Sequence, residues 1–456
     1  MRHNAVRQAN VYVPAALLVA GIAVSASAAT FPTEKRYLSK PLHICDQGSF
    51  FVGGVPKVTE YAEGVDATDP RQITIGQMYV QFQIPFVQRG WPLIHVHGST
   101  HTGAALESTP DGREGWLPYG VGHGIASYVV DQSGRGRSGF DHSVIHEGVR
   151  TGNLDLIPTF GRITDQRAWT AWFGHLIPEG STILDGTLIR HGDPGDPPDD
   201  DDRHPDTYFP AFPIPPVPNS VDPDIEAREG AIGPDVNPAN DTYLALEYYK
   251  QLVPNGEVTL PGSNCPTCDP MEVPPQNTWT PRNLATLVEG LDGAIVATHS
   301  QSGNMGHHMT RILKERGSLH LLKALITIEG GCSLPGAGLT GSDFDEIPYL
   351  AVSGDYRTDE QEQTCVDAIA EINASPTRTA SPATFLELDE TGDPTFDGTT
   401  HMMMLGTNNI EVFDAIREWV DDNVPDQPGK TACFADHKDG KRKGFHRGDK
   451  GKSFTK

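Results

Sequence analysis

Short apolar runs, each ending in glycine or polar residues, alternate with helical patterns over most of the chain and restrict its possible folds. The stretches NLATLVEGL, NMGHHMTRILKERG and VFDAIREWVDD carry apolar residues at helical spacing. This alternation is typical of a parallel sheet with helices on both faces, in which functional residues gather at the carboxyl ends of the strands. The apolar runs lie at residues 92–98, 125–139, 292–300, 322–331, 348–356 and 383–390.

Two stretches before these runs predict an antiparallel hairpin. GSFFVGG (48–54) and QMYVQFQIP (77–85) are rich in aromatic and β-branched residues and are bounded by glycine and proline. A chain of 456 residues with 37% hydrophobic content can bury the core of one large domain. We therefore expect an α/β domain over residues 29–429, with a mostly parallel, doubly wound sheet and an N-terminal antiparallel hairpin.

Residues 160–280 interrupt the alternation just before the apolar run at 292–300, and we expect them to form a cap or substrate wall. Within this insertion, residues 191–221 are too rich in proline and aspartate for regular helix or strand. The consecutive residues Asp199–Asp202 lack the alternating spacing of a calcium loop and predict a solvated loop. The CPTC pair, Cys265 and Cys268, lacks the second pair of ligands that a zinc site needs. We expect no metal site.

The N-terminal 28 residues have the features of a secretory signal peptide. Arg2 and Arg7 precede the apolar run VYVPAALLVAGIAV, and the small residues ending at Ala28 favour cleavage there. The run is shorter than the ~20 apolar residues of a membrane-spanning helix. We therefore expect an exported protein, extracellular or periplasmic, without a transmembrane segment. The Lys- and Gly-rich tail at 430–456 predicts disorder.

Charge and motifs exclude several classes of partner. The formal net charge of −25 disfavours nucleic-acid binding, which relies on clustered Lys and Arg. The DQSGRGRSG stretch (131–139) lacks the Lys and Ser/Thr of a phosphate-binding loop, and no dinucleotide fingerprint is present, so we expect no cofactor. Asn240 and Asn373 fit the glycosylation sequon, which matters only in a eukaryotic host. The sequence does not indicate an oligomeric state.

Ser300 lies where an apolar run gives way to a helical pattern, in AIVATHSQSGNMGHH. A nucleophile elbow places its serine on a strained strand-to-helix turn with small residues two positions away on each side. Thr298 and Ser302 occupy those positions, and Gly303 follows. The pattern therefore predicts a serine nucleophile at Ser300.

A nucleophilic serine needs a base to take its proton, and in folds of this kind the base follows the last strand. His401 lies after the strand-like ATFLELDE and before the closing helical stretch, whereas His307 and His308 follow the serine too closely. The base needs a carboxylate to fix its tautomer. Glu329 and Asp355 both end predicted strands, and the residues alone leave the two open.

The motifs resemble those of the α/β-hydrolase superfamily, and within it a group of secreted serine esterases with an H-S-Q-S-G elbow. The resemblance covers most of residues 45–425 and rests on GSFFVGG, HGSTHTG followed by STPDGREGW, DQSGRGRSG, HSQSG, IEGG and THMMML. In this group the triad acid is a Glu at the end of the strand after the nucleophile helix. The resemblance therefore implies Ser300 as nucleophile, His401 as base and Glu329 as acid.

The same resemblance implies an oxyanion hole formed by the backbone N–H groups of Gln301 and Ser99. Members of the group can carry two adjacent cysteines after the HG, where this chain has Ser99 and Thr100. A backbone donor survives that change. The expected function is hydrolysis of a carboxylic ester, small or lipid-like, through an acyl-enzyme. Lactones and amides are alternative substrates, and a non-catalytic binding protein with this fold is the alternative from another class.

Six cysteines in an exported chain indicate disulfides, and six allow 15 pairings. Cys332 follows the strand carrying Glu329, and Cys365 lies shortly after the strand ending near Asp355. Because the two loops leave the same edge of the predicted sheet, we expect a disulfide between Cys332 and Cys365.

Overall fold

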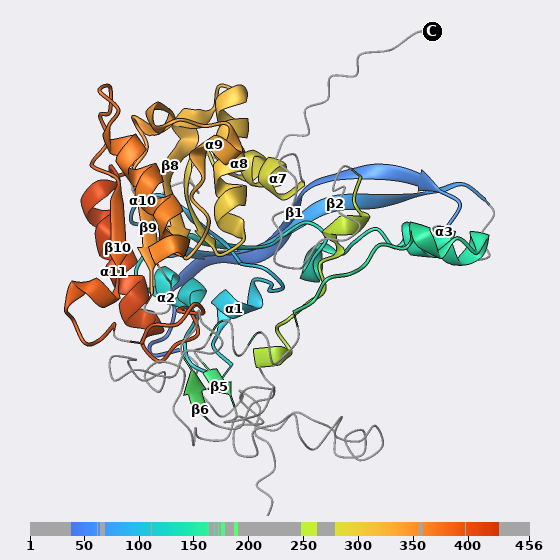
Figure 1. Cartoon of the computed structure of the whole chain (residues 1–456), viewed down its shortest axis with the longest axis horizontal. Helices are drawn as coiled ribbons and strands as arrows, with labels where there is room; N and C mark the ends of the chain where they lie inside the picture. Colours follow the sequence, from blue (N-terminus) through green and yellow to red (C-terminus); the bar gives the residue numbers. More distant parts are fainter. Residues whose placement is uncertain are drawn as a thin grey trace, which may run out of the picture.

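The computed structural model describes residues 38–163 (apart from 62, 64–68 and 111), 168, 172, 175–177, 187–189, 248–261, 279–354 and 359–427 (apart from 397). Its main feature is an eight-stranded sheet (Figure 1). The order across the sheet is β1 (Ile44–Thr59), β2 (Arg71–Pro85), β4 (Ser127–Asp131), β3 (Leu93–Val96), β7 (Ala294–His299), β8 (Leu322–Ile328), β9 (Tyr349–Ser353) and β10 (Thr384–Glu387).

The strand directions confirm the expected mostly parallel sheet with an antiparallel hairpin. β1 pairs antiparallel with β2, and β2 pairs antiparallel with β4. From β4 through β10 every neighbouring pair is parallel. Parallel neighbours need crossover connections, and the helices supply them.

Helices cover both faces of this sheet, as a doubly wound fold requires (Figure 1). One buried cluster joins strand residues to α2 and α11, and the other joins strand residues to α7, α8 and α10. The helices are α1 (Ala104–Glu107), α2 (Trp116–Gly122), α3 (Ser143–Thr151), α7 (Trp279–Gly290), α8 (Ser302–Glu315), α9 (Leu334–Ala337), α10 (Asp359–Asn373) and α11 (Asn409–Asn423).

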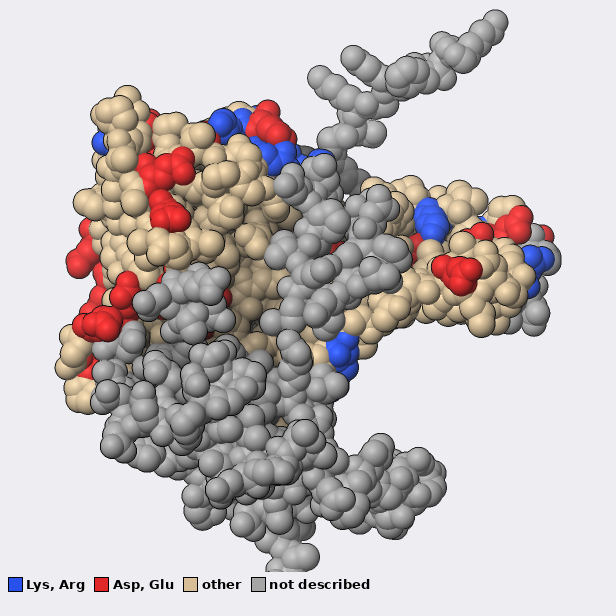
Figure 2. All heavy atoms as spheres, viewed as in Figure 1, with Lys and Arg blue, Asp and Glu red and all other residues tan. Residues whose placement is uncertain are grey.

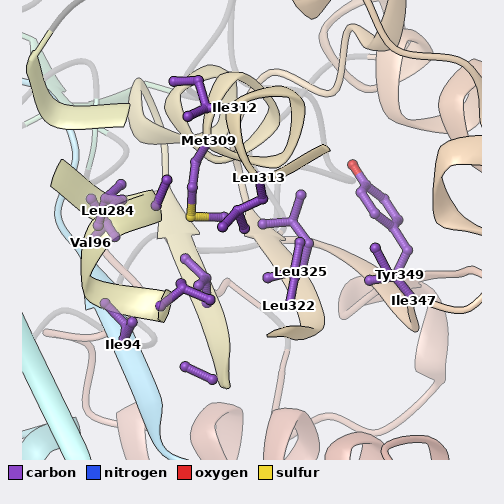
Figure 3. Packing of buried hydrophobic residues seen from close by; sticks show 14 of the residues in the cluster. Ile94, Val96, Leu284, Met309, Ile312, Leu313, Leu322, Leu325, Ile347 and Tyr349 are labelled. Atoms are coloured by element: carbon purple, nitrogen blue, oxygen red, sulfur yellow. The ribbon is translucent and has the colours of Figure 1, made fainter. Parts of the chain in front are cut away.

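Alternating strand residues divide between these two cores. On β3, Leu93 belongs to the α2/α11 side, whereas Ile94 and Val96 belong to the α7/α8 side. Figure 3 shows the second core, where Met309 and Leu313 of α8 lie over the strands. Burial of each such side chain contributes about 1.5–3 kcal/mol, so strands buried on both faces anchor the carboxyl edge that carries the site.

The β1–β2 hairpin extends beyond the sheet as an arm, with α3 alongside its far end (Figure 1). β1 forms one edge of the sheet, and its residues Phe51 and Val58 are 56% and 68% exposed. On the face drawn in Figure 2, Asp and Glu side chains form separate patches on both the arm and the body.

Several predicted segments lie wholly or largely outside the described residues. These are the signal peptide (1–28), the Pro/Asp-rich loop (191–221) and the basic tail (430–456). Of the insertion at 160–280, the structure describes a two-stranded antiparallel sheet, β5 (His175–Ile177) with β6 (Thr187–Ile189), and the segment 248–261. In the described part of the chain, no helix is both long enough and apolar enough to cross a bilayer.

Candidate active site

Ser300 lies on the turn between β7 and the start of α8, with a left-handed backbone conformation (φ +55°). Its N–H donates to the carbonyl of Ile328 on β8 at 2.9 Å, which extends the parallel ladder by one residue. The hydroxyl of Ser302 accepts a hydrogen bond from the His299 N–H at 2.8 Å and donates to the carbonyl of Val96 at 3.0 Å. These bonds hold a turn that costs a non-glycine residue about 1–3 kcal/mol, and such strain clusters at functional sites.

Glu329 follows β8 directly and is also left-handed (φ +45°). Its N–H donates to the Val352 carbonyl of β9 at 2.8 Å, so this turn is held in the same way as the turn at Ser300. The two turns pack directly on each other at Gly330, where an added Cβ would lie 2.8 Å from the Ser300 carbonyl oxygen. Glycine at this position therefore allows the proposed nucleophile and acid turns to lie side by side.

His401 meets Glu329 across the carboxyl edge of the sheet. Its Nδ1 lies 2.6 Å from Oε2 of Glu329, and the other carboxylate oxygen, Oε1, accepts the Gly354 N–H at 2.7 Å. The Glu329 side chain is 1% exposed and the His401 side chain 13% exposed. A carboxylate held on both oxygens is well placed to fix the tautomer of the imidazole and to stabilise its protonated form.

The side chain before Ser300 connects the turn to His401. His299 Nε2 donates to the backbone carbonyl of His401 at 2.8 Å, and the two rings lie 4.7 Å apart between centroids. On its other side, His401 stacks with Trp172 at 6.0 Å. In the described residues, Ser300 Oγ makes no hydrogen bond to His401 Nε2. This contact is commonly long or poorly aligned in ligand-free enzymes.

The loop after β3, HGSTH (97–101), lies directly against Ser300. A Cβ added to Gly98 would lie 2.9 Å from Ser300 Cβ and 2.8 Å from His299 Nδ1, so only glycine fits there. Within the loop, Thr100 is left-handed (φ +56°). Ser99, the expected second oxyanion donor, is therefore next to the residue that touches Ser300, and Gln301 follows Ser300 at the start of α8.

Two histidines hold the carbonyl groups of this loop. His97 Nδ1 contacts the Gly98 carbonyl oxygen at 2.8 Å, and His101 Nδ1 contacts the Ser99 carbonyl oxygen at 2.7 Å. Their Nε2 atoms contact the N–H of Gln132 at 3.0 Å and the hydroxyl of Tyr248 at 3.1 Å. Since a neutral imidazole has one donor and one acceptor, each Nδ1 donates to the loop and each Nε2 accepts.

Burial keeps these histidines neutral. It lowers the pKa of His101 to about 3 against the opposing hydrogen bond to Ser99, and it lowers the pKa of His97 to about 4 against the nearby charge of Asp131. Burial and the neighbouring His401 hold the pKa of His299 well below its usual value. All three therefore serve as fixed hydrogen-bonding groups at neutral pH rather than as bases.

Arg135, from the DQSGRGRSG stretch, lies closer to this site than the sequence suggested. It is 1% exposed. Its Nη2 donates to the side-chain oxygen of Gln301 at 2.7 Å, and its Nη1 to the Gly98 carbonyl at 3.4 Å. The sequence pattern gave no signal for these contacts with Gly98 and Gln301.

Other predicted residues have varied outcomes. Cys332 and Cys365 form a disulfide with a Cα–Cα separation of 4.8 Å, the pairing expected from the sequence. The side chain of Asn373 exchanges hydrogen bonds of 2.9 and 2.8 Å with the backbone of Ala383, and its glycosylation stays a prediction. The predicted positions outside the described residues are Asp355, the alternative acid, with Asn240, Cys265 and Cys268. Over the described ranges, no three His, Cys, Asp or Glu side chains are grouped as metal ligands would be.

The structure is similar to a solved structure described as the atomic-resolution structure of a novel bacterial esterase. The TM-score is 0.62 and the sequences are 26% identical, and the similarity covers 86% of this chain and 99% of that chain. The fold is that of an α/β-hydrolase. This hydrolase fold confirms the fold class expected from the sequence.

Among curated proteins, a segment of 62 residues is 39% identical to "Probable secreted lipase phiG" from Fungal sp. (strain ATCC 74256). That segment is 13% of this chain and spans only 17% of the length of the fungal protein. No family model matches the chain.

Proposed function

We propose that this protein is an exported serine hydrolase that cleaves carboxylic esters. One arrangement carries the proposal: Ser300 lies on a left-handed turn between β7 and α8, and the preceding His299 bonds to the backbone of His401, whose Nδ1 lies 2.6 Å from Glu329. The chain order Ser, Glu, His is the order of triads in α/β-hydrolases. A chance grouping of these residues would not account for the two strained backbones at the ends of adjacent parallel strands.

In the proposed reaction, Ser300 Oγ attacks the ester carbonyl carbon and His401 Nε2 accepts its proton. His401 then donates this proton to the departing alcohol oxygen, which leaves an acyl group on Ser300. Water attacks the acyl-enzyme by the same route and releases the acid. Glu329 accepts the hydrogen bond from the Nδ1–H of His401 throughout and stabilises the imidazolium.

The negative charge that develops on the carbonyl oxygen needs donors in place before the reaction. The backbone N–H groups of Ser99 and Gln301 are the proposed donors. Ser99 follows Gly98, which lies against Ser300, and Gln301 follows Ser300 directly. Each such donor contributes about 10²- to 10³-fold to kcat in well-studied serine hydrolases.

Carboxylic esters are the favoured substrate class over lactones and amides, which the same machinery attacks. The support is the likeness to the bacterial esterase over nearly all of that chain, and the shorter match to the fungal protein named as a secreted lipase. Export is supported by the disulfide Cys332–Cys365, because disulfides persist in oxidising compartments.

Labelling with a fluorophosphonate and turnover of p-nitrophenyl esters of graded acyl length test the proposal together. We expect one label at Ser300, found by peptide mass mapping, and hydrolysis that is lost in Ser300→Ala. The exposed Ser342, in the short 3-10 helix Gly341–Phe344 that precedes β9, gives the matched control Ser342→Ala, which should label and turn over as the unaltered protein does.

Absence of both label and turnover in the folded, unaltered protein would instead support the non-catalytic binding protein. Undiminished turnover by folded Ser300→Ala would rule out Ser300 as nucleophile. Far-UV circular dichroism and thermal melting establish that each variant is folded.

A further inference from the structure

Three hydrogen bonds fix a buried guanidinium between the two proposed halves of the oxyanion hole. Arg135 donates to the Gln301 side chain at 2.7 Å, to the Gly98 carbonyl at 3.4 Å and to the Asn255 side chain at 3.4 Å. Its planar, forked shape allows one side chain to reach acceptors from three separate segments. These segments are the loop after β3, the start of α8 and the described segment 248–261 of the insertion.

The contact with Gly98 bears on the direction of a proposed catalytic donor. The carbonyl of Gly98 and the N–H of Ser99 belong to one peptide group, which is planar and trans, so they point in opposite directions. His97 Nδ1 at 2.8 Å and Arg135 at 3.4 Å bind the carbonyl from the protein interior. The Ser99 N–H is thereby turned away from them.

The contact with Gln301 bears on the other donor. Gln301 begins α8 with helical backbone angles (φ −49°, ψ −35°) and is 7% exposed. Its backbone N–H is the proposed oxyanion donor, and its side chain is the acceptor of the shortest Arg135 bond. The same guanidinium therefore binds the peptide group that carries the Ser99 N–H, through its Gly98 carbonyl, and the side chain of Gln301.

Arg135 keeps its charge in this environment. Burial lowers its pKa to about 10, and the nearby carboxylate of Glu257 opposes that lowering. The group is therefore a cation at neutral pH. A charged hydrogen bond is about twice as strong as a neutral one, which suits a group that must fix two backbone segments.

We infer that Arg135 is a positioning residue of the oxyanion hole, which fixes the Ser99 and Gln301 donors relative to each other through the Gly98 carbonyl and the Gln301 side chain. This inference rests on the proposed ester hydrolysis. Because the oxyanion exists only after attack on the carbonyl, misaligned donors should lower kcat much more than they raise KM.

The variants Arg135→Lys and Arg135→Met test the inference. We expect Arg135→Met to lower kcat about 10- to 100-fold, somewhat less than loss of an oxyanion donor itself, with little change in KM. Arg135→Lys keeps the charge but loses the forked shape, so its kcat should lie between those of the unaltered protein and Arg135→Met. Arg137→Met is the matched control: Arg137 pairs with Asp131 and Glu107 instead, so its loss should lower the melting temperature and leave kcat within about threefold.

A trifluoromethyl ketone gives a second readout, because its adduct with the serine carries an oxyanion in place of the ester carbonyl. Across the Arg135 variants, Ki for this inhibitor should rise by the same factor as kcat/KM falls. A merely structural role for Arg135 would move the melting temperature without this proportionality.

Gln301→Met keeps the backbone N–H and removes the acceptor, and it serves if Arg135→Met does not fold. Its kcat should fall, and the loss in the double variant with Arg135→Lys should be smaller than the product of the two single losses. Unchanged kcat in the Arg135 variants, or losses equal to those of Arg137→Met, would overturn the inference. An unaltered protein without esterase activity would overturn the proposed function instead.

Discussion

His299 Nε2 donates a 2.8 Å hydrogen bond to the backbone carbonyl of His401, so the residue before the proposed nucleophile holds the backbone of the proposed base. This bond joins β7 to the loop before α11, which supplies the base from a separate part of the chain. This bond therefore links the turn that carries Ser300 to the loop that carries His401, and it involves neither the Ser300 hydroxyl nor the His401 ring.

We expect His299→Phe to lower kcat by about tenfold or more and to lower stability by about 1 kcal/mol, because the partly buried carbonyl of His401 loses its donor. His299→Gln keeps an N–H donor of similar reach and should recover part of both losses. Kinetics on one activated ester and thermal melting measure the two effects. Equal activity in the Phe and Gln variants would show that this hydrogen bond does not contribute to catalysis.

Glu329→Gln should reduce kcat by about 10³- to 10⁴-fold with the fold intact, because a neutral amide neither selects the His401 tautomer nor stabilises the imidazolium. Asp355→Asn is the comparison, since both carboxylates end predicted strands, and it should cost much less. Measurement of kcat for both variants, with circular dichroism, decides between them. A severe loss in Asp355→Asn alone would transfer the acid role to Asp355.

Gly98→Ala should greatly reduce ester hydrolysis, because the added Cβ would meet Ser300 Cβ at 2.9 Å and push apart the loop and the nucleophile turn. Gly122→Ala is a suitable control. A Cβ at Gly122, at the end of α2, has only an ordinary contact at 3.5 Å and should be neutral or stabilise by roughly 0.5–1 kcal/mol. Similar kinetics for both variants would show that the loop at Gly98 can shift to fit the added Cβ without affecting hydrolysis.

Replacement of Cys332 and Cys365 by alanine should lower stability by about 2–4 kcal/mol, since the bridge restricts a loop of 33 residues in the unfolded chain. The effect on kcat should be smaller than that of Glu329→Gln. Thermal melting with and without reductant measures the loss, and mass mapping of unreduced peptides should find the linked pair. Two free thiols in protein secreted under oxidising conditions would contradict the pairing.

Acid should destabilise the protein as pH falls from about 6.5 toward 4. Burial lowers the pKa of His95 and His101 to about 3 and that of His97, His307 and His308 to about 4. Below 6.5 the unfolded chain therefore binds protons that the folded chain does not, so stability is full above that pH and is lost as pH falls.

Each such histidine contributes about 1.4 kcal/mol per pH unit within this window. Thermal melting between pH 7 and pH 4 tests the dependence, and the slope should decrease in His307→Gln. A melting temperature that stays constant over this range would contradict neutral buried histidines.

The sheet was predictable because its strands are buried on both faces and so appear as apolar runs with glycine-bearing ends. The places of Ser300 on a strand-to-helix turn and of His401 before the last helix were predictable for a similar reason, since both depend on the order of strands and helices, and their catalytic roles stay proposals. The residues alone left the acid open, because Glu329 and Asp355 both end predicted strands. The family resemblance implied Glu329, and its contact with His401 at 2.6 Å supports that choice.

The supporting residues were beyond reach of the sequence. Arg135 contacts Gly98 across 37 residues and Gln301 across 166 residues, so its role depends on long-range packing that no local pattern encodes. The sequence shows that HGSTH contains two histidines, but not what they bind. Which carbonyl each one holds follows only from the path of the loop in the folded chain.

The site draws together segments that are distant along the chain: Ser302 bonds to Val96 across 206 residues, and His299 bonds to His401 across a further 102. During synthesis the chain leaves the ribosome from its N-terminus, and its early segments begin to fold first. A nascent chain that already includes Ser300 still lacks His401 and the later strands β8, β9 and β10. The proposed hydrolysis therefore requires nearly the whole chain, and truncated products that end before His401 should be inactive toward esters.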